Sequence, residues 1–157
     1  MYCDLHVHSS ASCDSDTEIW DVCERAIGVG LEAVAFTEHV ELAPGDYCYK
    51  RYDYERSKSA CDKAKERYRG RIEVLFGAEV TYHSWIEGEI RCFLAEHGFD
   101  LIIGSVHDTP PISLWDPVSA ELVKSSPDTA RLALRNYLDE VRRLALDRAV
   151  RHSGPFW

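Results

Sequence analysis

The chain has 157 residues, 45% of them hydrophobic and 29% charged, which is the size and composition of one globular domain, predicted over residues 1–157. The formal net charge of −9 argues against a basic nucleic-acid-binding surface, although bound divalent cations would offset part of it. No apolar run reaches the roughly 18 residues of a membrane span, and the first residues lack the pattern of a secretion signal. We therefore expect no nucleic-acid partner, no membrane segment and a cytoplasmic location.

The cysteines of the chain do not form the closely spaced pairs that zinc-ribbon and thioredoxin-like sites require. In a cytoplasmic protein we expect them to be reduced and to behave mostly as small core residues. They are Cys3, Cys13, Cys23, Cys48, Cys61 and Cys92.

The first half of the chain predicts two strands, each followed by a helix. An apolar run at 2–7 predicts the first strand. Apolar residues at helical spacing after Thr17 then predict a helix that Thr17 caps and that ends near Gly28. A second apolar run at 32–37 predicts another strand, and a polar loop leads from it to a charged surface helix at 55–69.

The second half continues this alternation. Strands predicted at 72–78 and 99–106 flank a short helix at 86–97, and a proline-containing loop leads to a long helix over about 128–150. The strand runs are continuously apolar, as expected for parallel strands that helices cover. The order predicts parallel strands joined by right-handed crossovers, and hence an α/β fold.

Each predicted strand ends in side chains that can bind metal ions. The four segments are Asp4-Leu5-His6-Val7-His8, Thr37-Glu38-His39, Gly77-Ala78-Glu79 and Gly104-Ser105-Val106-His107. In a parallel α/β barrel, the C-terminal ends of the strands meet at one mouth, where active sites lie. We therefore expect a metal centre formed by His6, His8, His39, Glu79 and His107.

The residue types in these segments suit zinc, manganese or iron. His6 and His8 are two positions apart, so on an extended strand both point to the same face. Glu79 follows a Gly-Ala step that lets other groups approach closely, and its carboxylate could bridge two ions. A structural role is the alternative for each residue taken alone, but it does not explain why four strands carry such groups.

Several nearby residues leave two interpretations open. Asp14, in the loop after the paired histidines, either completes the metal shell or caps a helix. Glu38 either supports the site or points away from it. Lys50 and Arg51 are the nearest candidates for phosphate contact, but they also fit a solvated loop. Three further histidines have no comparable setting and are expected to be structural: His83, His97 and His152.

The four segments, in this order, resemble the successive motifs of the PHP (polymerase and histidinol phosphatase) family. The resemblance covers the whole chain, and Phe36-Thr37-Glu38-His39 looks like the histidinol-phosphatase branch. It implies the first four βα units of a distorted (β/α)7 TIM-like barrel and a centre of two or three divalent metal ions (zinc, manganese or iron). The matching ligand positions are His6, His8, Asp14, His39, Glu79 and His107.

The resemblance also implies an activity. Clustered metals would lower the pKa of a bridging water and neutralise charge on a phosphoryl group. The substrate would be a small phosphate monoester, with L-histidinol phosphate as the leading candidate and a nucleotide or another phosphoester as the alternative. The catalytic set would be His6, His8, His39, Glu79 and His107.

The family's later ligand segments, of the Gly-His-x-Asp and Asp-x-His kinds, have no match in this sequence. Residues 153–156 resemble only the lead-in to a fifth strand. The sequence therefore predicts an incomplete barrel with weak activity, whose open sheet edge favours self-association. A non-catalytic, metal-binding remnant is the competing function. A polymerase-associated module would need a nucleic-acid surface, which the sequence does not show.

Overall fold

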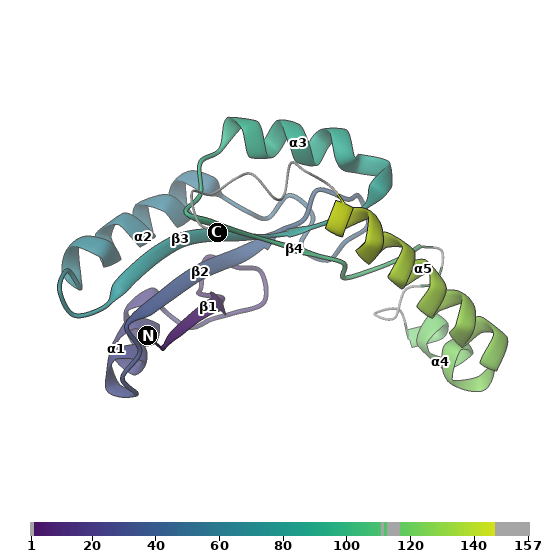
Figure 1. The fold of residues 1–157 in the computed structure, drawn as a ribbon, viewed down its shortest axis with the longest axis horizontal. Coiled ribbons are helices and arrows are strands. Elements are labelled where there is room, and N and C mark those ends of the chain that lie inside the picture. Colours follow the sequence, from purple (N-terminus) through teal and green to yellow (C-terminus); the bar gives the residue numbers. More distant parts are fainter. Residues whose placement is uncertain (1, 111, 113–116, 147–157) are drawn as a thin grey trace.

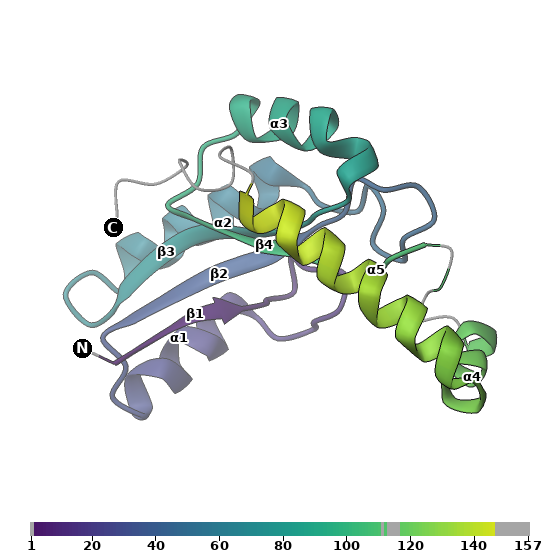
Figure 2. The same cartoon turned by 45° about the vertical axis from the view of Figure 1, so that its right-hand side comes forward.

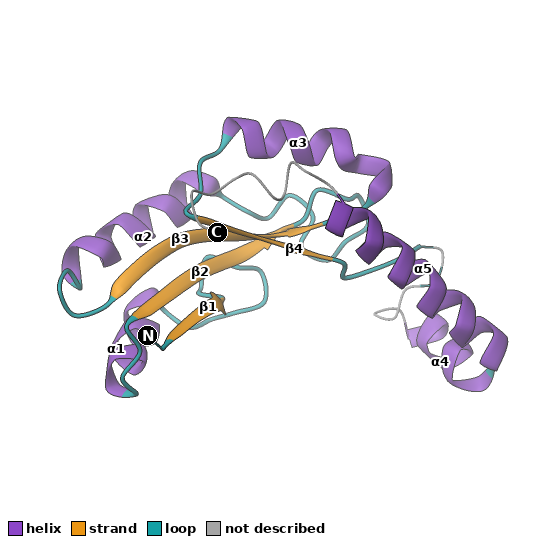
Figure 3. Ribbon diagram, in the orientation of Figure 1, coloured by secondary structure: helices purple, strands orange, loops and turns teal. Residues whose placement is uncertain are grey.

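A computed structural model describes residues 2–110, 112 and 117–146 of the chain. Its strands form one parallel sheet in the order β1-β2-β3-β4, and helices connect successive strands (Figures 1 and 3). The strands are β1 (Cys3–Val7), β2 (Ala33–Val40), β3 (Glu73–Thr81) and β4 (Leu101–Ser105). The helices are α1 (Ile19–Gly28), α2 (Tyr54–Arg67), the 3-10 turn η1 (Ser84–Ile86), α3 (Glu87–Glu96), α4 (Pro117–Ser125) and α5 (Pro127–Leu146).

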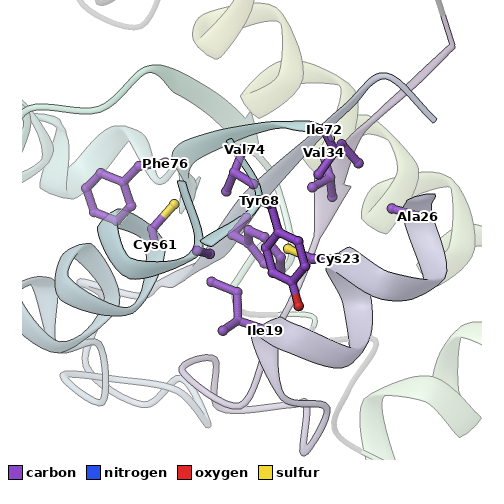
Figure 4. Close-up of a cluster of buried hydrophobic side chains, with 11 residues drawn as sticks. Ile19, Cys23, Ala26, Val34, Cys61, Tyr68, Ile72, Val74 and Phe76 are labelled. Atoms are coloured by element: carbon purple, nitrogen blue, oxygen red, sulfur yellow. The ribbon is translucent and has the colours of Figure 1, made fainter. Parts of the chain in front are cut away.

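The helix-covered face of the sheet is built from alternate residues of the two central strands. Val34 on β2 shares a buried cluster with Val74 and Phe76 on β3 (Figure 4). Phe36 on β2 belongs to the same cluster. Side chains of α1 and α2 complete this cluster, and the fully buried ring of Tyr68 just after α2 lies within it. A second cluster continues the same face toward the C-terminal ends of the strands, against η1 and α3.

The opposite face carries the intervening residues, because side chains alternate across a strand. The register of β2 and β3 pairs His39 with Glu79 and Thr37 with Gly77. Two of the predicted ligands therefore lie side by side, near the C-terminal ends of their strands and on the face away from the helices.

β1 and β4 form the two edges of the sheet. Cys3, Asp4 and His6 of β1 are exposed and no residue of β4 is buried, whereas β2 is buried along nearly its whole length. The described residues thus form an open half-barrel with the topology of the first four βα units, as predicted from the sequence.

The last two helices lie beyond the C-terminal ends of the strands (Figures 1 and 2). Leu144 near the end of α5 packs against the second core cluster, and η1 also contacts α5. Much of the remaining apolar surface of α5 is exposed to solvent. The exposed residues are Leu132, Leu134, Tyr137, Leu138 and Leu146.

The structure corrects two expectations about helices. The loop predicted to contain Pro117 instead continues into α4, which begins at that residue, a position where proline is well tolerated because the first helical N–H has no partner. The N-cap of α1 is Glu18, which makes no side-chain cap bond, and not Thr17. The Thr17 carbonyl instead accepts a hydrogen bond from the Ser10 N–H, so Thr17 belongs to the preceding loop.

Three features predicted for the C-terminus lie outside the described residues: the end of the last helix at 147–150, the structural role of His152, and the segment 153–156. Within the described part of the chain, no helix has the length and apolar content needed to cross a lipid bilayer.

Candidate metal centre

The predicted ligands come from four parallel strands whose C-terminal ends lie side by side. His6 lies in β1, His39 in β2 and Glu79 in β3, while His8 and His107 follow β1 and β4 within two residues. His39 and Glu79 lie inside their strands because β2 and β3 run further than predicted, to positions 40 and 81. The structure brings all five side chains together.

Glu79 lies at the centre of this group and is only 4% exposed. Its Oε2 atom is 3.1 Å from Nε2 of His6, 3.2 Å from Nε2 of His8 and 3.4 Å from Nδ1 of His39. Its Oε1 atom is 3.0 Å from Nε2 of His107. One carboxylate therefore faces four imidazoles and uses both of its oxygens, which is the arrangement expected of a carboxylate that bridges two ions.

Asp14 supplies a second carboxylate, on the other side of His8. Its Oδ1 atom is 3.0 Å from Nδ1 of His8, and its Oδ2 atom is 3.3 Å from Nε2 of His39. The Ser12 hydroxyl donates a hydrogen bond to the same carboxylate at 2.7 Å. Of the two interpretations of Asp14, the structure therefore favours the place among the ligands over helix capping.

The carboxylates change the protonation of the imidazoles. Hydrogen bonding to Glu79 raises the pKa of His8 to about 9, although burial opposes this change. Burial would lower the pKa of His107, but hydrogen bonds to Glu41 and Glu79 raise it to about 10. In the metal-free protein both imidazoles are therefore protonated near neutral pH, and they must release protons before they can bind a metal ion.

The pKa values of the two carboxylates shift in the opposite direction. Burial would raise the pKa of Asp14, but hydrogen bonds from His8 and Ser12 lower it to about 2. Burial would likewise raise the pKa of Glu79, yet hydrogen bonds from His107, His8 and other neighbours hold it below its usual value. Both carboxylates are ionised at neutral pH, as metal ligands must be.

The donor set fits divalent metal ions. Two ligands bound to zinc at about 2.1 Å in a tetrahedron lie about 3.4 Å apart, close to the contacts of 3.0–3.4 Å that Glu79 and Asp14 make. Two buried atoms, Nδ1 of His39 and Oε2 of Glu41, lack a hydrogen-bond partner within the described part of the chain. Three groups bring ligand atoms within 4.8 Å of one another: His6, His8 and Glu79; His8, Asp14 and His39; His39, Glu41 and His107. The metal-binding role of these residues stays a prediction.

Glu38 supports the site from the helix-facing side of β2. It is 2% exposed and accepts hydrogen bonds from the backbone N–H of Ser9 at 2.9 Å and from the Ser9 hydroxyl at 2.5 Å. Burial raises the pKa of Glu38 despite these bonds. Because Ser9 directly follows His8, Glu38 holds the segment that carries this predicted ligand.

Sequence reasoning overlooked three polar residues of the site. Oε1 of Glu41 lies 3.0 Å from Nδ1 of His107, and the Thr81 hydroxyl donates a hydrogen bond to the same oxygen. The Ser105 hydroxyl donates to Glu79 at 2.5 Å. Each of the three stands two positions from a predicted ligand. The alternation rule applied to the paired histidines of the first strand would therefore have placed them on the same face.

Two of the histidines expected to be structural lie outside the metal centre. The His97 ring donates a hydrogen bond from Nδ1 to the Phe93 carbonyl at 2.9 Å. His83 is buried and borders a polar cavity of about 220 Å³ between η1, the loop after β4 and α5. Residues that line this cavity include His83, Trp85, Thr109, Asp139, Glu140 and Arg143.

The two candidate phosphate contacts lie in the loop after β2. The Arg51 guanidinium lies over the ring of the exposed Tyr47, 4.4 Å from its centroid, and the Lys50 amine lies 5.0 Å from the ring centroid of Tyr49. These contacts are made within the loop itself, which favours the solvated-loop interpretation.

The expectation of reduced thiols is wrong for one pair of cysteines. Cys13 and Cys48 form a disulfide that joins the loop carrying Asp14 to the loop after β2. These loops follow neighbouring strands, so the fold brings together cysteines that are 35 residues apart in the sequence. Cys23 and Cys61 are buried core residues, as predicted, whereas the two remaining cysteines are exposed: Cys3 and Cys92. A cytoplasmic location stays a prediction.

Known proteins are similar to this chain over most of its length. The histidinol-phosphatase of Lactococcus lactis subsp. lactis is 29% identical over 141 residues, which cover 88% of this chain and 51% of the relative. The histidinol-phosphatase of Bacillus subtilis is 31% identical over 115 residues, which cover 66% of this chain and 43% of the relative.

Solved structures share the fold. The histidinol phosphate phosphatase of Lactococcus lactis, crystallised with zinc, L-histidinol and phosphate, matches with a TM-score of 0.69 at 26% identity over 74% of this chain and 44% of that one. A structure from Listeria monocytogenes matches with a TM-score of 0.70 at 20% identity, over 83% of this chain and 57% of that one. The chain thus spans about half the length of the relatives it matches.

The family resemblance of the four strand-end segments is confirmed by an independent match. The sequence profile of the PHP domain covers residues 4–154, and so includes every predicted ligand. The half-barrel fold agrees with the solved histidinol phosphate phosphatase. On these grounds, the chain belongs to the PHP domain family.

Proposed function

We propose that this chain provides the N-terminal part of a metal-dependent phosphoesterase site that acts on a small phosphate monoester. The observation that carries the proposal is the convergence of four imidazoles on Glu79, at 3.0–3.4 Å, with Asp14 on the far side of His8. Ionised carboxylates and imidazoles at these separations are suited to hold divalent cations.

The geometry suggests how the ligands would be shared. His6, His8 and Glu79 would hold one ion, and His8 or His39 with Asp14 would hold another. His107 would contribute through Nε2, the nitrogen that faces Oε1 of Glu79. Such ions, when bound, activate water at neutral pH and stabilise the charge that develops on a phosphoryl group.

The proposed substrate is L-histidinol phosphate or a monoester of similar size. Support comes from the relatives named histidinol-phosphatase and from the solved relative that contains L-histidinol and phosphate. The polar cavity begins two residues beyond Thr81 and His107, at His83 and Thr109, and its volume of about 220 Å³ suits a small organic group. Beside the Glu140–Arg143 ion pair, its lining includes the ring of Trp85 and the carboxylate of Asp139, which suit a cationic heterocycle.

The test combines metal analysis with activity. The purified chain should take up zinc or manganese and release phosphate from L-histidinol phosphate. The double variant His6→Gln/His8→Gln should take up no more than about a tenth of the metal and lose the activity. The matched control is His97→Gln, which removes an imidazole outside the centre and should retain metal uptake. Equal metal uptake by both variants would contradict the proposal.

A second candidate is a non-catalytic, metal-binding PHP unit. It is favoured by the half-length match to the relatives and by the two sheet edges, β1 and β4, that have no further partner strand among the described residues. This candidate predicts the same metal uptake and the same loss in the double variant, but no phosphate release with any small monoester. The activity assay therefore separates the two.

A further inference from the structure

The ring of His107 lies between two buried carboxylates. Its Nε2 atom is 3.0 Å from Oε1 of Glu79, and its Nδ1 atom is 3.0 Å from Oε1 of Glu41. Glu79 belongs to the centre of the proposed site, whereas Glu41 stands on the opposite side of the ring. Both carboxylates are nearly inaccessible to solvent, at 4% and 2% exposure.

Glu41 is held in place by its own neighbours. It directly follows β2, and its carbonyl accepts a hydrogen bond from the backbone N–H of Lys50 at 3.2 Å. The register of Val40 with Val80 brings it beside Thr81, whose hydroxyl donates to Oε1 of Glu41. The Thr81 oxygen is also 2.7 Å from Nδ1 of His107, so the three side chains form a closed triangle.

The chemistry of this triangle determines which nitrogen of His107 keeps its hydrogen. A carboxylate oxygen accepts hydrogen bonds, so in the metal-free chain both nitrogens act as donors, Nδ1 to Glu41 and Nε2 to Glu79. Only Nε2 faces the centre of the proposed site, so a metal ion held there would take the place of the hydrogen on Nε2 and leave the Nδ1–H on Glu41. We propose that Glu41 is a positioning residue that keeps the Nδ1–H of His107 directed toward itself and Nε2 directed toward the metal centre. This inference rests on the metal-binding role proposed above.

His107 is the main residue on which Glu41 acts. Oε1 of Glu41 is also 3.3 Å from Nδ1 of His39, but this pair lacks the alignment of a hydrogen bond. A carboxylate behind a ligating imidazole sets its tautomer and orientation and makes it a better ligand, and loss of such a partner typically weakens metal binding about 10–100-fold.

The first test measures zinc affinity by competition with a chromophoric chelator. Glu41→Gln keeps the shape of the side chain but removes its charge, and it should bind zinc about 10–100-fold more weakly than the unmodified chain. The matched control is Asp100→Asn. Asp100 accepts hydrogen bonds from the Phe76 N–H and from Lys65 at the other end of the strands, so this variant should keep the original affinity.

The second test reads the tautomer directly and needs no variant that alters Glu41. Long-range ¹H–¹⁵N correlation spectra of the zinc-loaded chain, labelled at histidine, should show a protonated Nδ1 and a zinc-bound Nε2 for His107. The His107→Gln variant identifies the signal. Zinc on Nδ1 of His107 would overturn the proposal even if Glu41→Gln failed to fold.

The possible failures are distinguishable. If the unmodified chain binds no zinc, the proposed metal-binding function itself is wrong. If the unmodified chain and Glu41→Gln bind zinc equally well, with the same His107 tautomer, the metal centre stands and only the positioning role of Glu41 is overturned.

Discussion

At the scale of single residues, the centre balances charge by sharing protons between imidazoles and carboxylates. Glu79 faces four imidazoles, and Asp14 faces His8 and His39. Without a metal ion, protons on His8 and His107 neutralise the buried acids. A divalent ion would neutralise these acids in place of the protons, so metal binding is coupled to proton release.

The raised pKa values of His8 and His107 predict how the stability of the metal-free chain varies with pH. A group whose pKa is higher in the folded state stabilises the fold fully below its unfolded pKa, about 6.5 for histidine. This contribution is lost as the pH rises through the folded values, about 9 for His8 and about 10 for His107. In the presence of a chelator, the free energy of unfolding in urea should therefore fall between pH 6.5 and 8.5, by at most about 1.4 kcal/mol per pH unit for each imidazole.

The two buried thiols contribute only from the upper end of this window, because an unfolded thiol has a pKa of about 8.5, while burial raises the pKa of Cys23 to about 11 and that of Cys61 to about 12 in the folded chain. His8→Gln should reduce the slope, whereas His97→Gln should leave it unchanged. A stability that stays constant over this range would show that neither imidazole is held protonated by the carboxylates.

At the scale of the elements, the close approach of β2, β3 and β4 depends on Gly77. A Cβ atom at this position would lie 2.7 Å from Cγ2 of Thr37, 2.9 Å from the Leu101 carbonyl oxygen and 3.2 Å from that of Phe36. Two of these three atoms belong to the backbone of neighbouring strands and cannot move without disturbing the sheet.

We therefore expect Gly77→Ala to lower the free energy of unfolding by about 1–3 kcal/mol, the usual cost of overpacking. It should also weaken zinc binding, because Glu79 lies two residues further along the same strand. The control is Gly88→Ala in α3, where no atom lies within 4 Å of the new methyl group and alanine favours the helix by up to about 1 kcal/mol. The comparison is made by urea denaturation, and equal stabilities for the two variants would contradict the packing argument.

The order and type of the strands could be predicted from the sequence because each strand is a continuous apolar run with ligand-type residues at its end. The extension of β2 and β3 was missed because Glu38, Glu79 and Thr81 are polar residues inside strands, which apolar runs do not reveal. Glu41 follows β2 directly, and alternation from His39 could have placed it on the same face. Its contact with His107, however, joins residues 66 positions apart and depends on the register of three strands, which no local pattern encodes.

At the scale of the whole molecule, the sheet covers only part of a barrel. β1 and β4 each leave one side of the strand without a partner among the described residues, and α5 exposes an apolar stripe that includes Leu134 and Leu138. The relatives that the chain matches are about twice as long. In a closed barrel, further strands would pair with both edges and complete the mouth that holds the metal centre.

We expect the 157-residue chain to self-associate and to be a weak phosphatase. Unpaired parallel edges attract other strands, and a centre open on one side holds metal and substrate loosely. Light scattering after gel filtration should show mass that rises with concentration. Leu101→Lys, which places a charge on the β4 edge, should shift the chain toward monomer, whereas Leu134→Lys tests whether the α5 stripe is responsible instead.

The activity prediction compares this chain with a chimaera that adds the C-terminal half of the Lactococcus lactis relative. The chain should release phosphate from L-histidinol phosphate about 10²-fold or more slowly than the chimaera, since a misplacement of about 1 Å costs that much. A monomeric, cooperatively unfolding chain with the full activity of that relative would show that four strands suffice for the site.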